Sequence, residues 1–157
     1  MAHLIREYTH EDNTAVQQCL VELQNFHRMI DPHRLENATI ANEYLKHLLA
    51  KCEKNHGKIF VVEINNAVVG MISVVIQPDN ASARKIKKHA FISDLIILPE
   101  YRNRGISRDL LNKAEEYVKS KKVSVLETTV LIKNDKALRL YLRNGFHESE
   151  LILRKKV

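Results

Sequence analysis

The chain has 157 residues, of which 45% are hydrophobic and 28% are charged, and only 4 are Gly and 3 are Pro. This balance is typical of one globular domain with a buried core, and it argues against a disordered chain with long linkers. The formal net charge of +6 favours an anionic partner, although a solvated basic surface would give the same excess. The first residues lack the apolar stretch of a signal peptide, and no apolar run is long enough to span a membrane. We therefore expect a single domain, residues 1–157, in the cytoplasm.

The hydrophobic patterns predict an alternation of helices and strands. In chain order we expect a strand over 3–8, helices over 9–30 and 39–53, strands over 58–64, 67–76 and 89–98, a helix from 106, a strand over 123–130, a helix over 134–143, and one or two strands over 146–153. The strand over 89–98 is almost continuously apolar, which indicates a central, buried position. The order predicts a mixed α/β fold, a three-layer α/β/α sandwich around a mixed sheet of about six or seven strands.

A basic loop precedes the helix that is predicted from residue 106. The loop and the first turn of this helix contain Arg102, Asn103, Arg104, Gly105 and Arg108. The first turn of a helix has unpaired N–H groups and a positive dipole end, which together favour an anion such as phosphate. Three Arg at this end oppose the dipole unless an anion lies among them. A solvent-exposed turn that is merely basic is the alternative, and the loop alone favours the anion site only slightly.

The same loop resembles the signature R/Q-x-x-G-x-G/A of the GNAT superfamily of N-acetyltransferases. The matching residues are Arg102-Asn103-Arg104-Gly105-Ile106-Ser107. Two positions differ, because Asn103 and Ser107 stand where many members have small residues such as Gly or Ala. The resemblance implies that residues 102–108 bind the pyrophosphate of CoA, and the expected order of elements agrees with the family from the first strand to the last.

A second motif lies on the predicted helix over 134–143. Asn134, Ala137, Tyr141, Gly145 and Phe146 match the family pattern N-x-x-A-x-x-x-Y-x-x-x-G-F. The first three lie at i, i+3 and i+7, so they share one helical face, on which Ala leaves room for an extended ligand. The resemblance implies that Asn134 binds the pantetheine arm and that Tyr141 protonates the departing CoA thiolate. Tyr141 alone could be a core aromatic residue, but the two motifs in this order favour the catalytic interpretation.

The predicted strand over 89–98 carries the rest of the expected chemistry. A central strand that separates from its neighbour has free amides for the thioester carbonyl oxygen, and the resemblance assigns these amides to Ile96, Ile97 and Leu98. Many relatives have Glu at the position of Ser93, and Ser cannot act as the base there. Asp94 is the candidate base, with a raised pKa if it is buried, although strand alternation would turn it away from Ser93 and a structural role is equally compatible.

The acceptor is harder to infer from the sequence. The stretch around Phe26 resembles that of acetyltransferases for aminoglycosides and related small amines, and Glu22, Phe26 and Ser93 are the expected substrate contacts. Acidic side chains would favour a polycation, whereas the basic run Arg84–Lys88 favours an acidic or peptide substrate. We therefore expect an acetyl-CoA-dependent N-acetyltransferase that acts on a primary amine of a small molecule or a peptide.

Other classes receive less support. The alternative from the same fold is a non-catalytic acyl-CoA-binding or regulatory module. Nucleic acid is disfavoured as a partner, because aromatic residues are only 6% and Trp is absent. Neither Cys19 nor Cys52 is expected to be a nucleophile, and the eight His lack the spacing of metal ligands, so no metal is expected. A membrane partner is not expected, and a homodimer is left open.

Overall fold

The computed structural model describes residues 2–31, 33, 38–79 and 85–157. Its elements are β1 (Leu4–Glu7), the 3₁₀ turn η1 (His10–Asp12), α1 (Asn13–Ile30), α2 (Ala38–Lys54), β2 (Lys58–Ile64), β3 (Ala67–Pro78), β4 (Lys88–Ile97), the 3₁₀ turn η2 (Pro99–Tyr101), α3 (Ile106–Ser120), β5 (Leu126–Thr128) and α4 (Asp135–Arg143). The strands form one sheet in the order β1-β2-β3-β4-β5. The pairs from β1 to β4 are antiparallel, whereas β5 runs parallel to β4.

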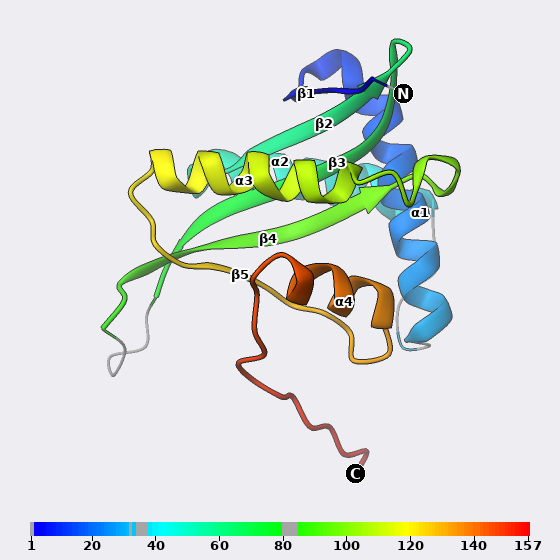
Figure 1. Cartoon of the computed structure of the whole chain (residues 1–157). Helices are drawn as coiled ribbons and strands as arrows, with labels where there is room; N and C mark the ends of the chain where they lie inside the picture. Colours follow the sequence, from blue (N-terminus) through cyan, green and yellow to red (C-terminus); the bar gives the residue numbers. More distant parts are fainter. Residues whose placement is uncertain (1, 32, 34–37, 80–84) are drawn as a thin grey trace.

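Helices cover both faces of this sheet, as predicted. In Figure 1, α3 crosses one face and α4 lies beside β4 and β5, while α1 and α2 lie behind the sheet. Each face has its own hydrophobic core. One core joins α3 and Tyr141 of α4 to the sheet, and the other joins α1 and α2 to it. The three-layer α/β/α architecture inferred from the sequence is therefore confirmed.

The sheet has fewer strands than we expected. Five strands are present in the described residues, because the stretch predicted as a final strand, 146–153, has no strand structure. Gly145 adopts φ 86° after α4 and turns the chain, which then leaves the body as an extended segment (Figure 1). Leu151, Ile152 and Leu153 are exposed there. The sequence carries strand-forming residues at this point. However, β5 pairs over only three residues, so it offers a further strand little edge to pair with.

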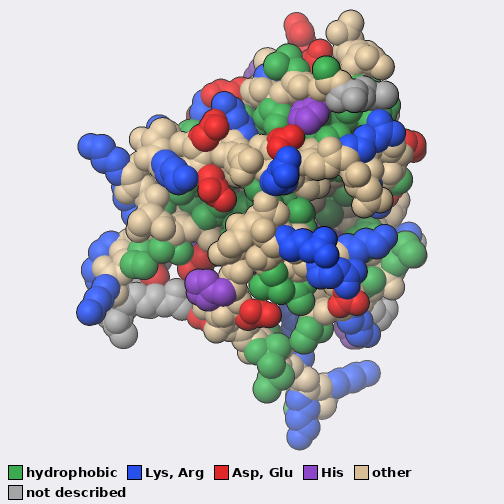
Figure 2. All heavy atoms as spheres, in the orientation of Figure 1, with side chains coloured by type: hydrophobic (Ala, Val, Ile, Leu, Met, Phe, Trp, Pro, Cys, Tyr) green, Lys and Arg blue, Asp and Glu red, His purple; other side chains and the backbone are tan. Residues whose placement is uncertain are grey.

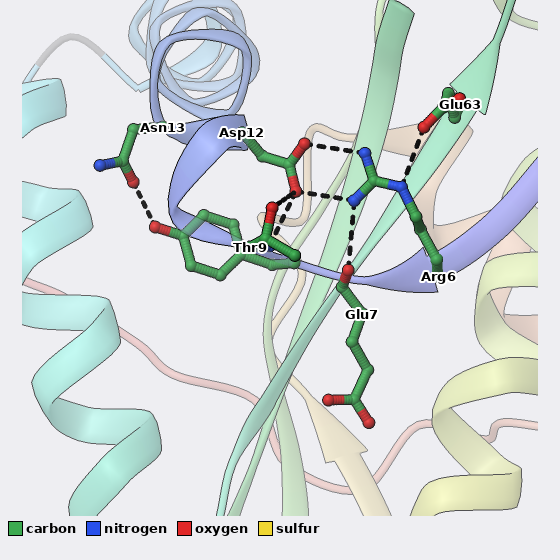
Figure 3. A network of polar contacts seen from close by, with 7 residues as sticks. Arg6, Glu7, Thr9, Asp12, Asn13 and Glu63 are labelled. Atoms are coloured by element: carbon green, nitrogen blue, oxygen red, sulfur yellow. Dashed lines mark hydrogen bonds and ion pairs between the residues drawn. The ribbon is translucent and has the colours of Figure 1, made fainter. Parts of the chain in front are cut away.

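A network of charged and polar side chains fixes the start of α1 against the sheet (Figure 3). Arg6 on β1 donates from Nη1 and Nη2 to both carboxylate oxygens of Asp12, at 2.8 and 2.9 Å, and from Nε to Glu63 of β2 at 2.9 Å. Asp12 also accepts from the amide of Thr9 at 2.8 Å, which completes a capping box. These bonds lower the pKa of Asp12 and raise that of Arg6. The ionised pair is therefore the stable form, and it sets where α1 begins.

The surface bears on two predictions about partners and location. Figure 2 shows Lys and Arg side chains in several separate groups on the face that α3 and α4 cover, without one continuous basic stripe on that face. No helix within the described ranges is both apolar and long enough to cross a membrane. The expected cytoplasmic location, the disfavoured nucleic acid and the open homodimer stay predictions.

Candidate active site

The sheet opens between β4 and β5. The two strands pair only at Ala90–Ile92 and Leu126–Thr128, and the hydroxyl of Thr128 donates to the carbonyl oxygen of Ile92 at 3.2 Å. β4 continues to Ile97, whereas β5 ends at Thr128. The last part of β4 therefore has a strand neighbour on its β3 side only, within the residues that the structure describes. This separation is the opening that an extended ligand requires between two strands.

The pairing with β3 corrects the assignment of the free amides. The amide of Leu98 donates to the carbonyl oxygen of Val69 at 2.9 Å, so it is not free. Since antiparallel pairing alternates, the amide of Ile96, which is paired with Met71, also faces β3. Ile97 lies between them and directs its N–H toward the opening. Of the three amides expected from the resemblance, only that of Ile97 is positioned for a ligand.

A glycine on β3 makes this part of β4 fit closely. Gly70 is buried and lies opposite Ile97. A Cβ atom at Gly70 would lie 2.5 Å from Cδ1 of Ile97 and 2.7 Å from the carbonyl oxygen of Ile96. Because one of these atoms belongs to the backbone, a side chain here would force β4 to move. Gly70 therefore allows β4 to approach β3 at the level of the opening.

The loop after β4 has the geometry of an anion site. Asn103 and Gly105 have φ values of 63° and 79°, so the small residues there adopt the left-handed conformation. Gly105 is exposed and is the N-cap of α3. In the described part of the chain, no acceptor is bonded to the amides of Gly105, Ile106 and Ser107. Three consecutive donors at a helix N-terminus are thus available to a phosphate, as the sequence predicted.

The three arginines of this loop differ in their contacts. Arg102 points inward, where Nε donates to the carbonyl oxygen of Ile97 at 2.8 Å and Nη2 to Glu22 of α1 at 3.1 Å. Arg104 donates to the carbonyl oxygen of Glu100 at 2.9 Å and lies over the ring of Tyr101. Arg108 is largely exposed beside Asp109. Arg102 therefore holds β4, the loop and α1 together, which leaves Arg104 and Arg108 nearer the surface.

Helix α4 places its motif as the spacing predicted. Asn134 is the N-cap, and its Oδ1 accepts from the amide of Ala137 at 3.1 Å, which leaves its Nδ2 donors for a ligand. Gly145 adopts a positive φ at the end of the helix, and the amide of Phe146 donates back to the carbonyl oxygen of Tyr141 at 3.1 Å. The rings of Phe146 and Tyr141 then meet edge to face, 5.1 Å apart. The Gly-Phe end of the motif therefore fixes the catalytic candidate Tyr141.

Tyr141 is a buried phenol at the mouth of the opening. Its hydroxyl interacts with the side chain of Thr128, the residue at which β5 ends. Burial raises the pKa of Tyr141 to about 12, the nearby Asp94 acts in the same direction, and the interaction with Thr128 acts against them. The phenol is therefore protonated at neutral pH, which is the form that a general acid needs.

The expected orientation of Asp94 is wrong. Alternation predicted that Asp94 and Ser93 face opposite sides, yet both contact α2. The hydroxyl of Tyr44 donates to Oδ1 of Asp94 at 2.8 Å, and Nζ of Lys51 donates to Oγ of Ser93 at 3.3 Å. The cause is an irregularity in the pairing of β3 and β4 at Ser73, where the register shifts and the alternation is broken. Asp94 therefore points to the same side as the expected acceptor contacts.

Sequence reasoning missed two partners of Asp94. Ser73 on β3 is fully buried and donates to Oδ2 of Asp94 at 2.8 Å. Tyr44 on α2 takes the other carboxylate oxygen. A single Ser within the apolar strand over 67–76 was a signal for a buried polar partner. The two donors oppose the effect of burial, which raises the pKa of Asp94.

A hollow of about 460 Å³ lies beside the end of β4. Its lining comes from α1, α2 and the start of the loop, namely Thr14, Gln17, Gln18, Val21, Glu22, Ala41, Leu98, Pro99 and Glu100. Glu22, an expected substrate contact, is part of this lining, although Arg102 neutralises it. Phe26 is one turn further along α1, outside the lining, with its ring against His27. Arg84, the first residue of the basic run that entered the argument about the acceptor, lies outside the described residues.

The two cysteines are buried in the core beneath α1 and α2. Burial raises the pKa of the Cys19 thiol to about 12 and that of Cys52 to about 11. A protonated, buried thiol is a poor nucleophile. The geometry therefore agrees with direct transfer to the acceptor rather than transfer through a cysteine.

Comparison with known proteins gives both a family and a fold. The profile of the acetyltransferase (GNAT) family matches residues 7–146. The chain is 31% identical over 127 residues to an uncharacterised N-acetyltransferase from Methanocaldococcus jannaschii, a match that covers 80% of this chain and 54% of the relative. It is 36% identical over 85 residues to the aminoalkylphosphonate N-acetyltransferase of Salmonella typhimurium, over 54% of this chain and 53% of the relative. The chain thus spans about half the length of these relatives.

Solved structures show the same architecture. An aminoglycoside 6'-N-acetyltransferase from Acinetobacter haemolyticus superimposes with a TM-score of 0.75 at 15% identity, over 98% of this chain and 99% of that one. At this identity the likeness concerns the fold alone. The arrangement of β4, β5 and the basic loop therefore belongs to a known architecture.

Proposed function

Because the chain belongs to the acetyltransferase (GNAT) family, we propose that residues 1–157 form one N-acetyltransferase domain that moves an acetyl group from acetyl-CoA directly to a primary amine. The observation that carries the proposal is that the fold leaves three groups for a ligand. These groups are the free amides at Gly105–Ser107, the donors of Asn134, and the protonated Tyr141 where β5 ends. They suit a pyrophosphate, a pantetheine arm and a thioester in that order.

The residues of the opening fit CoA physically. The amides after Gly105 and the positive end of α3 bind the pyrophosphate, and Arg108 at the surface adds charge. Nδ2 of Asn134 donates to the arm, and the small side chain of Ala137 leaves space beside it. The loop amides and Nδ2 of Asn134 are donors that no other described residue occupies, so binding there displaces no protein hydrogen bond.

Two groups act on the reacting atoms. The amide of Ile97 donates to the carbonyl oxygen of the thioester, where negative charge develops as the amine attacks. As the C–N bond forms and the C–S bond breaks, Tyr141 gives its hydroxyl proton to the thiolate sulfur. The nitrogen loses its surplus proton to solvent, and Tyr141 is protonated again. Asp94, on the acceptor side of β4, is the proposed base that keeps the amine neutral.

The hollow beside β4 is the proposed site of the acceptor. Its lining mixes apolar and polar residues and is weakly acidic; Gln17, Gln18 and Glu100 take part in it, and Glu22 is paired with Arg102. A small amine fits a hollow of about 460 Å³ better than a folded protein surface does. Aminoalkylphosphonate and aminoglycoside enzymes among the similar proteins also act on amines of small molecules. We therefore propose a small-molecule amine, in preference to a peptide, as the acceptor.

The test combines binding with turnover. Acetyl-CoA is titrated into the protein by calorimetry, and a panel of small amines and short peptides is then assayed by release of free thiol. We expect micromolar binding and thiol release that depends on the amine. Binding without thiol release across the panel would favour a non-catalytic acyl-CoA-binding module, and absence of binding would reject the proposed site.

A further inference from the structure

A chain of three side chains runs from α2 into the middle of the sheet. The hydroxyl of Tyr44 donates to Oδ1 of Asp94, and the hydroxyl of Ser73 donates to Oδ2, each at 2.8 Å. Asp94 is 4% exposed and Ser73 is fully buried, whereas Tyr44 is half-buried. Both oxygens of a buried carboxylate are thus satisfied, and one of the two donors reaches toward the surface.

This arrangement has a cost that packing alone does not explain. Burying a carboxylate in an apolar strand is unfavourable even when hydroxyl groups compensate it. The groups that act on Asp94 from the surrounding elements are Tyr44, Lys51 and Cys52 of α2, Ser73 of β3, and Tyr141 of α4. Lys51 is the cation among them, yet its ammonium group bonds Ser93 rather than Asp94. Burial raises the pKa of Asp94, and its two hydroxyl partners, with no direct ion pair among the described residues, suit a group that takes up and releases a proton.

Tyr44 lies near the acceptor hollow along α2, although it is not among the lining residues. Ala41 lines that hollow, and Tyr44 lies three residues further along α2, so the two share one face of the helix. Asp94 itself is too deeply buried to touch a molecule in the hollow. A phenol can receive a proton and release its own in the same step, which makes Tyr44 suited to link the two.

We propose that Tyr44 is a catalytic residue that carries a proton from the bound acceptor to Asp94. The inference rests on the proposed function and names the route by which the base acts. The acceptor binds as an ammonium ion; its N–H proton passes to Oη of Tyr44, while the hydroxyl proton of Tyr44 passes to Oδ1 of Asp94. The amine becomes neutral, and Asp94 later returns the proton to solvent. Ser73 holds the carboxylate and takes no part in the transfer.

The test uses three variants of the whole chain. Tyr44→Phe removes the hydroxyl and keeps the ring, and Asp94→Asn removes the charge and keeps the volume. Tyr117→Phe is the matched control, because Tyr117 is a half-buried tyrosine on α3 whose hydroxyl donates to the carbonyl oxygen of His56, away from the site. Circular dichroism and acetyl-CoA titration establish that each variant is folded and binds the donor.

The expected results concern rate and pH together. Tyr44→Phe and Asp94→Asn each lower kcat by about 10²-fold, and the double variant is no slower than the slower single one, because residues that act as a unit are not additive. In the Tyr44→Phe and Asp94→Asn variants, the acid limb of the kcat profile, which is the pH range in which kcat falls on acidification, moves up to the pKa of the acceptor amine. Tyr117→Phe keeps the rate and the limb of the unchanged protein.

Several outcomes would overturn the inference. A Tyr44→Phe variant with the original acid limb and kcat within about twofold removes Tyr44 from the proton route. Effects of the two substitutions that multiply in the double variant show that they act separately. Should Tyr44→Phe be unfolded, Asp94→Asn decides alone, since an unmoved limb there rejects the route. If the unchanged protein acetylates no amine, the proposed function fails as well, which separates the two conclusions.

Discussion

The donor half and the acceptor half of the site are built in different ways. The donor half consists of two continuous segments, the loop before α3 and the helix α4 with its Gly-Phe end, and each carries several functional groups in a row. The acceptor half takes single residues from separate elements, such as Tyr44 of α2, Ser73 of β3 and Asp94 of β4. A ligand that is bound by backbone amides and a helical face leaves a readable motif. A proton route across three elements leaves isolated polar residues among apolar ones.

The largest expected effect falls in the donor half, at its chemical end. Tyr141→Phe should lower kcat by about 10²-fold, because the thiolate loses its proton donor while the ring still packs on Phe146. Steady-state thiol release measures the rate, and calorimetry should give an unchanged Kd for acetyl-CoA. A variant with full turnover would contradict the role of Tyr141.

The next effect tests whether the loop binds through its backbone. Gly105→Ala should weaken acetyl-CoA binding about tenfold, since a side chain at φ 79° costs about 1–2 kcal/mol and relaxation of the loop from this strain would turn its amides away from the ligand. Gly145→Ala is the matched control, with a similar φ of 86° and nothing within 4 Å of the added Cβ. Thermal melts should show similar destabilisation in both variants, with the larger loss of affinity in Gly105→Ala. Equal affinities would mean that the loop is not the pyrophosphate site.

A third prediction concerns the ion pair of Arg6 and Asp12, which positions α1 in the acceptor half. Asp12→Asn should lower the free energy of unfolding by about 1–2 kcal/mol at neutral pH, because Arg6 loses an ionised partner at the start of α1. The pKa of Asp12 is lowered in the folded state, so its contribution is present above the ordinary carboxyl pKa and is lost as the pH falls toward the lowered value. The difference from the unchanged protein should therefore shrink below about pH 4.

Denaturant unfolding at neutral and acidic pH measures this difference. Since α1 also carries Gln17 and Gln18 of the hollow, the same variant should raise KM for the amine and leave the Kd for acetyl-CoA unchanged. Equal changes in both constants would show that the two halves are not separable in this way.

The smallest effect is expected at the cysteines. Cys19 and Cys52 are buried and have raised pKa values, so iodoacetamide at pH 7.5 should modify neither thiol in the folded protein. Mass spectrometry measures the labelling, and unfolded protein provides the control in which both thiols react. Rapid labelling with loss of activity would place a reactive thiol in the acceptor half.

The sequence predicted much of the fold because its local signals are strong. The hairpin turn at Asn65-Asn66 has positive φ at both residues, as that short turn requires, and α3 begins directly after Gly105. The strand predicted over 146–153 was wrong, because a strand depends on a partner and the alternation of apolar residues does not supply one. Local signals in the sequence indicate whether a segment forms a helix or a strand, whereas the edges of a sheet depend on pairing between distant segments.

The site shows the same division. Gly105, Asn134 and Tyr141 were predicted from their spacing, and their local geometry agrees with it because each is positioned by its own segment; their roles stay predictions. Asp94 was identified as a candidate but assigned to the wrong side, because the irregularity opposite Ser73 is a property of two strands together. The prediction that the amides of Ile96 and Leu98 are free was wrong for a related reason, because their pairing with β3 depends on the register of the two strands.

Gly70 has a consequence for how the opening between β4 and β5 can change. It touches neither the loop nor α4, yet any larger side chain there would press on the backbone of Ile96 and on the side chain of Ile97. The position of this edge of the opening thus depends on the β3 side of β4 as well. A substitution at Gly70 on β3 would therefore shift the amide of Ile97 together with the edge of the opening.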